Sequence, residues 1–448
     1  MHNFKAIILA GGSGTRMKSR LPKPLHKLSG TPMIIWIVNA IIQSRIKDII
    51  TIVPANHEAF QNILEHKSEL AVQDPPKGSG HALLQSKRKA DKAKNILVLN
   101  SDMPLIKSET LTTLINHHQS SEADITVLTS KVKRPKGFGR IIRNSEGKIT
   151  NIVEEPEADI EQKLIDEINA GAYCFKTSWL WDALESLKPS KSGEFFLTDL
   201  INFAHILKLN IESLITEEEE IIGVNNKSDL ARAGKLSRAA ICEKLMNDGV
   251  IIIDPDTTYI DSEVTIGADT TIFPNTHLTG NTNISFHSEI GPNSVISNSS
   301  IGSKCIIKSS TIESAVILDE VKVGPYSHIR EGSILKSNVE IGNYVEIKNC
   351  TLGNGTKSGH HCYLGDSDIG SNVNIGAGTI TCNYDGTDKH RTIIKDEAFI
   401  GSDTKLIAPV IIGEKSITGA GSIITKDIPD FSKGIGTPAR ILKGDRSL

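Results

Sequence analysis

The chain has 448 residues, carries a formal net charge of −3 at pH 7, and contains 23% charged and only 4% aromatic residues. This length predicts two or three domains with ample hydrophobic core, and the charge gives no electrostatic basis for binding nucleic acid or an anionic membrane. No apolar run reaches the roughly 18 residues that a membrane-spanning helix needs, so we expect no membrane anchor.

Two further features predict a cytoplasmic location. The apolar segment at residues 6–10 is too short for a signal peptide and leads straight into a glycine-rich loop. The six cysteines are scattered without CxxC spacing, which is typical of reduced thiols rather than of a zinc site or a disulfide framework.

The first half of the chain alternates short apolar strands with helical patterns. One helix is expected from Thr31 to about residue 46, with Thr31 as its N-cap and Pro32 at its first position. This alternation predicts an α/β domain with a mostly parallel sheet, whose ligands bind beyond the carboxyl ends of the strands. The expected strands lie at residues 5–9, 49–53, 70–73, 96–99 and 125–129.

A glycine-rich loop at residues 10–17, Ala-Gly-Gly-Ser-Gly-Thr-Arg-Met, follows the first strand. Its backbone amides can point at phosphate oxygens without interference from a Cβ atom. It is not a Walker A loop, because no Gly-Lys-Ser/Thr closes it, and not a dinucleotide fingerprint, because Met17 stands where the third glycine belongs. Arg16 and Lys23 lie near it, so we interpret the loop as an anion site rather than as a turn with solvated charges.

A helix with an apolar stripe is predicted at residues 226–247, and Gly249 stands at a C-cap-like position after it. We place the domain boundary here. The predicted parts are a first domain at residues 1–225, a linker helix at 226–248, and a second domain with a C-terminal tail at 249–448. The alternative is that this segment is simply another helix of the first domain.

In the second half an aliphatic residue returns at every sixth position, and the first run extends from Ile260 to Ile296. After a slip the period resumes at Val323, and again at Ile394. A period of six is typical of a hexapeptide parallel β-helix, in which three hexads close one triangular coil. We expect the aliphatic residues to point inward and to stack roughly 4.8 Å apart. Small residues should fill the corners, where the backbone needs positive φ.

The six-residue period is broken at residues 348–366 and at 382–391, and sites are expected where a regular stack is interrupted. The second segment is polar, carries a turn signal, and should project as a loop. In the first, a neutral His360 imidazole can take a proton from an amine nucleophile near pH 7. A lone histidine is more often structural, but Tyr363 and Lys348 nearby favour the functional interpretation.

The motifs of the first half resemble those of sugar-1-phosphate nucleotidyltransferases. Because a hexapeptide β-helix follows, nearly the whole chain is similar to the bacterial bifunctional N-acetylglucosamine-1-phosphate uridylyltransferase / glucosamine-1-phosphate acetyltransferase family. The fold that this resemblance implies is an α/β, Rossmann-like nucleotidyltransferase domain followed by a left-handed parallel β-helix. The motifs are residues 9–17, Leu-Pro-Lys-Pro-Leu at 21–25, Gln73, Gly-Ser-Gly-His-Ala at 78–82, Asn-Ser-Asp-Met-Pro-Leu at 100–105, Gly-Phe-Gly-Arg at 137–140, Val153-Glu154, Asn-Ala-Gly at 169–171, Gly-Val-Asn-Asn at 223–226, and residues 372–386.

The resemblance implies an enzyme that makes UDP-N-acetylglucosamine, a precursor of peptidoglycan and lipopolysaccharide. Glucosamine-1-phosphate would be acetylated by acetyl-CoA, and the product would then take UMP from UTP with release of pyrophosphate. Nucleotidyl transfer needs positioning and charge neutralisation more than covalent participation by the protein. The resemblance also implies a homotrimer whose partners are these small molecules.

In the first domain, the resemblance assigns Asp102 and Asn225 to Mg²⁺, a hard cation that takes few protein oxygens and keeps waters. Arg16, as a catalytic residue, and Lys23 would neutralise the triphosphate and the departing pyrophosphate. For Asp102 the alternative is a helix N-cap after a strand. The other substrate-binding residues would be Leu9, Ala10, Gly11 and Gly12 in the loop, Gln73, Gly78 and Ser79 at the uracil edge, and Gly139, Glu154 and Asn169 around the sugar; Asn225 would contact substrate as well as metal.

In the second domain, the resemblance makes His360 the catalytic base. Two positions depart from the family pattern: Glu331, whose negative charge is expected to weaken phosphate binding at the neighbouring Arg330, and Cys362, where the family favours threonine. The remaining assignments are Arg330 and Lys348 for the sugar phosphate, Tyr363 and Asn374 for the sugar, and Ala377, Asn383, Tyr384, Ser402 and Ala420 for the acetyl-CoA groove.

Two other hypotheses stay open from the sequence. In the first, the chain carries out nucleotidyl transfer only, and the coils regulate or oligomerise it. In the second, the coils are a zinc-binding or purely structural module. Zinc on this fold would need three convergent histidines, whereas His360 and His361 are adjacent, so their side chains should diverge.

Overall fold

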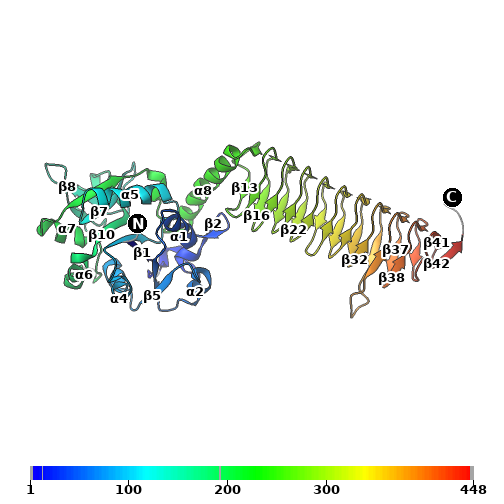
Figure 1. Ribbon diagram of the computed structural model, residues 1–448, viewed down its shortest axis with the longest axis horizontal. Coiled ribbons are helices and arrows are strands. Elements are labelled where there is room, and N and C mark those ends of the chain that lie inside the picture. Colours follow the sequence, from blue (N-terminus) through cyan, green and yellow to red (C-terminus); the bar gives the residue numbers. More distant parts are fainter. Residues whose placement is uncertain (1–3, 13, 191–192, 444–448) are drawn as a thin grey trace. The chain divides into compact units, whose positions relative to one another are not determined.

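The structure is a computed structural model that describes residues 4–12, 14–190 and 193–443 (Figure 1). The chain divides into two compact units, Met1–Ser237 and Arg238–Leu448. The division falls inside helix α8 (Lys227–Asn247), which is the helix predicted between the two halves. No helix in the described ranges is both long and apolar enough to cross a membrane.

A nine-stranded sheet organises the first unit, and it contains all five predicted strands. Strand β1 pairs in parallel with β4 and β6, whereas β10 runs antiparallel to β6 and β7. The sheet is therefore mostly parallel, as predicted, with two reversed strands, β10 and β9. The order is β11 (Ile211–Ile215), β7 (Ile125–Lys131), β10 (Glu167–Lys176), β6 (Asn95–Asn100), β1 (Phe4–Leu9), β4 (Ile49–Pro54) and β5 (Glu69–Gln73), with β8 (Arg140–Arg143) and β9 (Ile149–Val153) beside β10.

Both faces of this sheet are buried because helices cover each of them. Successive side chains of a strand point to opposite faces, so Ala6 and Ile8 enter one core and Ile7 enters the other. Strands buried on both faces are continuously apolar, which is why the sequence shows runs rather than alternation. The first core takes α1 (Met33–Gln43), α2 (Glu58–Leu64) and α5 (Ser108–Ser120); the second takes α3 (Ser79–Leu84), α6 (Thr177–Ser186) and α7 (Asp199–Ile206).

The predicted start of the first helix is wrong by one residue, and its predicted end near residue 46 is about three residues too late. Helix α1 begins at Met33, and Pro32 rather than Thr31 occupies its N-cap position. Thr31 instead pairs with Leu28 in a two-stranded antiparallel ribbon, so its backbone is extended. A local hairpin through Ser29 and Gly30 has overridden the N-cap preference of threonine.

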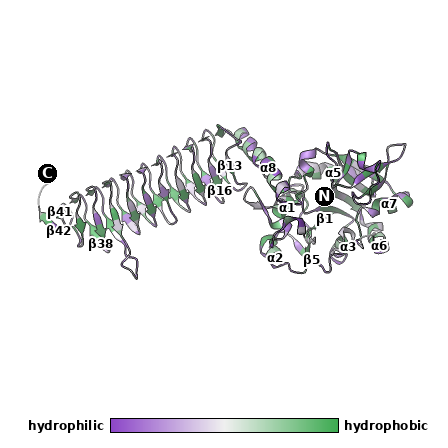
Figure 2. Cartoon of the chain, turned by 180° about the vertical axis from the view of Figure 1, so that it is seen from behind, coloured by the Kyte–Doolittle hydropathy of each residue, from purple (hydrophilic) through white to green (hydrophobic). Residues whose placement is uncertain are grey.

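Helix α8 ends as the sequence predicts. Gly249 has φ +96°, and the amide of Val250 donates to the carbonyl of Leu245 at 3.0 Å, which satisfies carbonyls of the last turn. Hydrophilic and hydrophobic residues alternate along the helix (Figure 2). Ala233 belongs to a core cluster of the first unit, and Cys242 belongs to the core of the second.

Three sheets of short strands form the second unit, and they are parallel except for the antiparallel pair β41 (Ser432–Gly436) and β42 (Ala439–Lys443) that ends one of them (Figure 1). In one of them, β12 (Ile251–Ile252) pairs with β15 (Thr271–Ile272), and β15 pairs with β18 (Glu289–Ile290). Neighbours in a sheet are thus three strands apart in the chain, so three strands close one coil. The hexapeptide β-helix predicted from the six-residue period is confirmed.

The repeated aliphatic residues point inward and stack on one another. Ile272, Ile290, Ile307 and Val323 pair in register through successive coils, and none is more than 2% exposed. Burying each such side chain stabilises the fold by about 1.5–3 kcal/mol relative to leaving it exposed. Together these side chains form the hydrophobic core of the second unit.

Buried hydroxyl groups satisfy the backbone at one corner of the coils. The amide of Val345 donates to Ser327 Oγ at 3.1 Å, and the amide of Ser327 donates to Ser310 Oγ at 3.2 Å. Each serine therefore accepts from the backbone one coil further along. This ladder explains why serine or threonine recurs beside the inward aliphatic residue, since buried amides need partners.

The corner residues are not all small, which differs from the expectation. Tyr326, Tyr344 and His361 adopt φ of +62°, +58° and +46° at equivalent corners of successive coils. Such φ values are unusual for bulky residues, but here the side chains project outward and their rings stack. Ring centroids are 5.5 Å apart between the two tyrosines and 5.1 Å apart between Tyr344 and His361.

The two interruptions of the period differ in kind. In the first, Ile341 pairs with Ser358 and Ser358 with Ile375, so the chain stays in the stack with coils of 17 residues. In the second, the chain leaves the stack after Cys382 as a loop that returns at Thr392 (Figure 1). The projecting loop is therefore confirmed, whereas the first interruption only shortens a corner.

Two candidate active sites

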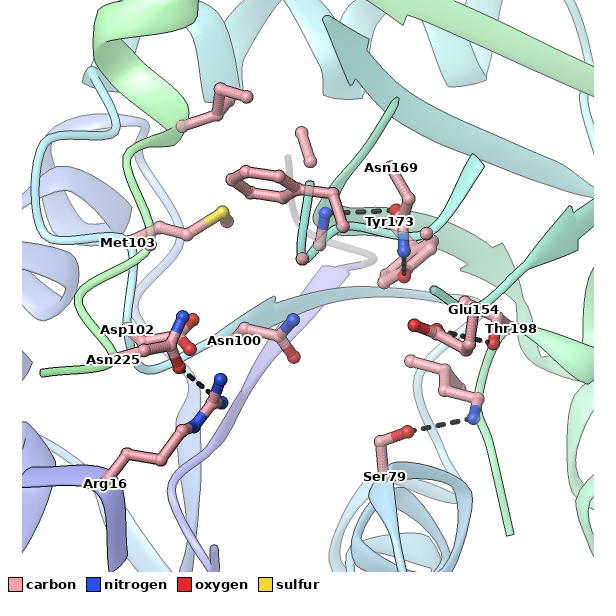
Figure 3. A pocket seen from close by; sticks show the side chains of 18 residues that line it. Arg16, Ser79, Asn100, Asp102, Met103, Glu154, Asn169, Tyr173, Thr198 and Asn225 are labelled. Atoms are coloured by element: carbon pink, nitrogen blue, oxygen red, sulfur yellow. Dashed lines mark hydrogen bonds between the residues drawn. The ribbon is translucent and has the colours of Figure 1, made fainter. Parts of the chain in front are cut away.

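The loop after β1 carries Arg16 to the carboxyl edge of the first sheet (Figure 3). Arg16 Nη2 donates to Asn225 Oδ1 at 2.8 Å, and Lys23 Nζ donates to Asp102 Oδ2 at 2.8 Å. Gly14 has φ +59°, and a Cβ there would lie 2.9 Å from the Cβ of Lys23, so only glycine fits this turn. The two predicted cations thus meet the two predicted metal ligands; Ser13 of the loop lies outside the described residues.

Backbone contacts hold Asp102 and Asn225 together. The amide of Val224 donates to the carbonyl of Asp102 at 2.8 Å. Asn226 and Asp229 exchange hydrogen bonds as a capping box at the start of α8, and Asp229 Oδ2 also accepts from the amide of Asn225 at 2.9 Å. The alternative role of Asp102 as an N-cap is wrong, because α5 begins at Ser108, six residues later.

The donor set at this edge fits a magnesium ion. Lys23 Nζ lies 2.8 Å from Asp102 Oδ2 and 3.2 Å from Asn225 Oδ1, so both oxygens converge on one position. One carboxylate and one amide oxygen are the few protein ligands that Mg²⁺ takes while keeping its waters. Clusters of three or more His, Cys, Asp or Glu side chains suited to a metal are absent from the residues that the structure describes.

Most of the residues predicted to contact the nucleotide line one cavity of about 360 Å³, a size typical of ligand sites, whereas Arg16 lines the adjoining one. Gly78 has φ +102°, and a Cβ there would lie 2.6 Å from the carbonyl oxygen of Phe195. Ser79 Oγ accepts from the amide of Leu197 at 2.9 Å (Figure 3), which fixes the first turn of α3. The predicted residues on the lining are Leu9, Ala10, Gly11, Gly12, Lys23, Gln73, Gly78, Ser79 and Asp102.

An adjoining cavity of about 190 Å³ contains the residues predicted for the sugar, Gly139, Glu154 and Asn169. Glu154 Oε1 accepts from Thr198 Oγ1 at 3.0 Å (Figure 3). Asn169 Nδ2 donates to Tyr173 Oη at 2.6 Å (Figure 3), and the amide of Asn169 donates to the carbonyl of Gly139 at 2.9 Å. The contacts bring β8, β9 and β10 to one site.

Three further residues of this cavity were not found from the sequence. Asn100 could have been found, because it belongs to the same motif as Asp102. Tyr173 and Thr198 carry no motif, and only the tertiary structure brings them to Asn169 and Glu154. Burial raises the pKa of the Tyr173 hydroxyl, so that group stays protonated and donates or accepts as a neutral phenol.

Glu154 has a raised pKa, chiefly because burial disfavours its charged form. The ordinary pKa of a glutamate is 4.5, so above about pH 4.5 this carboxyl keeps its proton in the native state but loses it in the unfolded state. The free energy of unfolding therefore falls as the pH rises from 4.5 through the raised pKa of Glu154. We predict that Glu154→Gln raises the melting temperature of the first unit at pH 8 but not at pH 4. Thermal melting at the two pH values measures this difference.

The same substitution should weaken sugar binding, because a hydrogen bond to a charged acceptor is worth about 1.5–3 kcal/mol. We expect the KM for the sugar phosphate to rise by about tenfold to hundredfold. Glu185→Gln is a matched control, since that carboxylate is an exposed partner of Lys87 away from both cavities. Equal melting shifts at pH 4 and pH 8 would contradict the burial argument.

The second candidate site is a column of residues along one corner of the β-helix. Pairing of Ser358 with Ile375, of Ile375 with Ile400 and of Phe399 with Ile417 puts four predicted residues in equivalent positions of successive coils. Coils stack roughly 4.8 Å apart. These four residues are His360, which ends β30 (Lys357–His360) with its side chain exposed, and then Ala377, Ser402 and Ala420.

The two predicted phosphate-binding cations are neighbours on the adjoining sheet. Ile329 pairs with Ile347, so Arg330 and Lys348 lie side by side in consecutive coils. Lys348 pairs in turn with Gly365, and a Cβ at Gly365 would lie 2.5 Å from Tyr363 Oη. The tyrosine hydroxyl therefore lies over the glycine next to Lys348, which brings three predicted sugar-phosphate residues together.

The two departures from the family pattern have different surroundings. Arg330 Nη1 donates to Glu346 Oε1 at 2.7 Å, and this hydrogen bond raises the pKa of Arg330 more than the nearby charge of Glu331 does. Glu346, which the sequence did not suggest, is thus the main partner of Arg330. Cys362 is buried, and its thiol donates to the carbonyl of His360 at 3.0 Å, so it does not face the exposed column.

Two carboxylates hold the projecting loop at its ends. Asp366 accepts from Asn349 Nδ2 at 2.6 Å and from the side-chain Nδ2 of Asn383, where the loop begins. Asp368 forms a bidentate ion pair with Arg391, where the loop ends. Asn383 is consequently buried at the loop base, whereas Tyr384 is exposed within the loop and Asn374 is exposed on its strand.

Comparison with known proteins gives matches over both halves. Residues 5–213 match the nucleotidyl transferase family, and residues 283–368 match the GlmU-like C-terminal hexapeptide family. Proteins described as "Bifunctional protein GlmU" from Geotalea uraniireducens and Carboxydothermus hydrogenoformans are 43% and 42% identical to the chain; the alignments cover 99% of it and 98% and 99% of those proteins. A third, from Streptococcus suis, is 44% identical, over 97% of this chain and 95% of its own length.

Proposed function

We infer the activity from the premise that this chain belongs to the GlmU family of bifunctional proteins, whose members match it over nearly their full length. It is an enzyme that makes UDP-N-acetylglucosamine. It acetylates glucosamine-1-phosphate and then transfers UMP from UTP to the N-acetylated sugar phosphate. The observation that carries this assignment is the convergence of two cations on Asp102 and Asn225 in the first half, together with an exposed histidine column and a pair of neighbouring cations in the second.

For the acetyl transfer, we propose that His360 takes the proton from the sugar amine. The freed nitrogen lone pair attacks the carbonyl carbon of acetyl-CoA, and the C–S bond breaks so that coenzyme A leaves as a thiolate. Exposure of His360 at the head of its column, beside Ala377 and Ser402, supports a donor that lies along that corner. Arg330 and Lys348 are then positioned to bind the sugar phosphate.

For the uridylyl transfer, we propose that a phosphate oxygen of the sugar attacks the α-phosphorus of UTP in line and that pyrophosphate leaves. Asp102 and Asn225 would hold Mg²⁺, which supplies charge neutralisation on the phosphate oxygens. Lys23 and Arg16 pair with the same two side chains in this structure. A bound triphosphate offers both cations new anionic partners, and this exchange releases Asp102 and Asn225 for the metal.

We further propose that the enzyme works as a cytoplasmic homotrimer. One face of the β-helix supports this, because exposed aliphatic side chains recur at one register position, in two stretches that the polar Thr351 and Asp368 separate. Val316 pairs with Ile334, and further along the same sheet Ile393 pairs with Ile411; each is between 38% and 41% exposed. Aligned apolar residues on a regular flat surface favour association with another copy of the chain.

The test supplies glucosamine-1-phosphate, acetyl-CoA, UTP and Mg²⁺ to the purified protein. We expect UDP-N-acetylglucosamine, coenzyme A and pyrophosphate to appear together. Without acetyl-CoA no UDP-N-acetylglucosamine should form, and adding N-acetylglucosamine-1-phosphate should restore it. If UDP-N-acetylglucosamine formed only from added N-acetylglucosamine-1-phosphate, the result would favour the nucleotidyltransferase-only hypothesis and contradict the two-reaction assignment.

A further inference from the structure

One wall of the sugar cavity is a loop of three residues, Gly137, Phe138 and Gly139, all of which line the cavity. A loop with two glycines has little rigidity of its own, because glycine permits many backbone conformations. Gly137 has φ +92°, and a Cβ added there would meet no atom within 4 Å, so packing on that side does not hold the loop. The loop therefore depends on other contacts to keep its place in the cavity wall.

A buried arginine directly after the loop supplies the first of these contacts. Arg140 is 1% exposed, begins β8, and pairs with Val153 of β9 and with Ile168 of β10. Its Nη1 donates to the carbonyl of Phe138, and its Nη2 donates to Glu155 Oε2 at 2.6 Å. The rigid fork of the guanidinium therefore ties the middle of the loop to the segment that follows β9.

Glu155 holds the start of the same loop, because the backbone amide of Gly137 donates a hydrogen bond to its carboxylate. Burial by itself raises the pKa of Glu155, but the hydrogen bonds from Arg140 and Gly137 outweigh this effect and keep the pKa below its ordinary value, so the carboxylate is charged. Glu154, which precedes it, carries a carboxylate that would lie 3.5 Å from a Cβ at Gly139. The pair of Arg140 and Glu155, here called the loop clamp, thus joins the loop to the segment that holds Glu154.

The loop clamp determines which way the peptide between Phe138 and Gly139 faces. This peptide is trans, so its C=O and its N–H point to opposite sides. Because the carbonyl of Phe138 points at Arg140, the N–H of Gly139 points away from the guanidinium, and no acceptor in residues 4–12, 14–190 and 193–443 takes it. The carbonyl of Gly139 is held separately by the amide of Asn169 at 2.9 Å. The Gly139 amide is therefore a fixed donor in the cavity wall that is left for a ligand.

We propose that Arg140 and Glu155 are positioning residues that hold the Gly139 amide in place as a hydrogen-bond donor to the sugar phosphate. The acceptor is a hydroxyl or the acetamido oxygen of the sugar. Neither residue of the loop clamp lines a cavity, so both act through the loop. The loop lines the sugar cavity and not the nucleotide cavity, so loss of the loop clamp should weaken binding of the sugar phosphate and spare UTP. The inference rests on the proposed uridylyl transfer and adds to it the means by which the sugar cavity keeps its shape.

The test compares Arg140→Met, which removes both hydrogen bonds of the guanidinium, with Arg140→Lys, which keeps a cation and its donors beside Glu155. The measured quantities are the KM for N-acetylglucosamine-1-phosphate and the KM for UTP. We expect Arg140→Met to raise the KM for the sugar phosphate by about threefold to tenfold, the equivalent of one lost hydrogen bond. The KM for UTP should stay within about twofold, because the loss concerns binding of one substrate only. Arg140→Lys should raise the KM for the sugar phosphate less than Arg140→Met does.

Arg143→Met is the matched control. Arg143 also belongs to β8 and also pairs with a glutamate, Glu167, at 2.6 Å, but it lines neither cavity. This variant should lower the melting temperature and leave both KM values unchanged. Melting temperature and acetyl transfer, which uses the other unit, show whether each variant is folded.

Should Arg140→Met not fold, Glu155→Gln replaces it, since it keeps the size of the side chain and removes the charge that Arg140 and the Gly137 amide share. An unchanged KM for the sugar phosphate in the folded variant, an equal rise in the KM for UTP, or an equal effect of Arg140→Lys and Arg140→Met overturns the positioning role. Absence of UTP turnover by the unchanged protein would instead contradict the proposed uridylyl transfer itself, so the two failures are distinguishable.

Discussion

Replacement of Asp102 by asparagine is expected to lower kcat/KM for uridylyl transfer by on the order of 10³-fold and to leave acetyl transfer unchanged. Loss of a preorganised charge at the reacting phosphates typically costs 10²–10³ in rate, and here the removed carboxylate is also the only charged member of the proposed magnesium pair. The substitution keeps the size of the side chain. Its effect on folding should be small, because the ion pair with Lys23 is partly exposed.

The measurement is pyrophosphate release from UTP and N-acetylglucosamine-1-phosphate as a function of Mg²⁺ concentration. The variant should need more Mg²⁺ for half-maximal rate. Glu185→Gln, which removes an exposed carboxylate of the same unit, should leave both the rate and the Mg²⁺ dependence unchanged. A rate within tenfold of the unchanged protein at all Mg²⁺ concentrations would exclude Asp102 as a metal ligand.

The reciprocal result is expected for His360→Ala. A positioned general base contributes about 10²–10⁴ to a rate, so acetyl transfer should fall by that factor while uridylyl transfer stays intact. The imidazole is exposed at the end of its strand, so its removal should cost little stability. Formation of free coenzyme A thiol from acetyl-CoA and glucosamine-1-phosphate measures the rate.

The neighbouring histidine is the natural control. The ring of His361 stacks on Tyr344, away from the column that His360 heads, so His361→Ala should retain acetyl transfer within a few-fold. If both histidine variants lost acetyl transfer equally, damage to the corner would be the better explanation. If His360→Ala retained full activity, another group would have to accept the amine proton.

Periodic features of the chain were predictable because their physical cause is local. The central strands of the first sheet bury both faces, so they are continuous apolar runs that are easily recognised. The observed bounds of the five predicted strands differ from the predicted ones by at most two residues. The coils follow from the inward aliphatic residue of each hexad. Gly249 ended the helix before the coils as predicted, because a left-handed C-cap has a strong local preference for glycine.

Partners that depend on tertiary register were not predictable. Glu346 meets Arg330 only because the coils repeat every 16 to 18 residues in that region, a spacing that shifts wherever a corner is shortened. Thr198 reaches Glu154 across 44 residues, and no local pattern marks it. The start of α1 was misplaced for a different, local reason, because Ser29 and Gly30, with φ of +44° and +80°, form a tight turn that pairs Thr31 with Leu28.

The coil pairing has a consequence for how the second half of the chain can vary in length. Each strand pairs with the strand that lies one full coil further along the chain, as Ile272 pairs with Ile290. Gain or loss of a whole circuit preserves every aliphatic contact on either side, whereas a change by two or three residues inside a strand would turn buried isoleucines toward water. Natural variants of this length should therefore cluster at multiples of one circuit, or sit entirely within corners and the projecting loop.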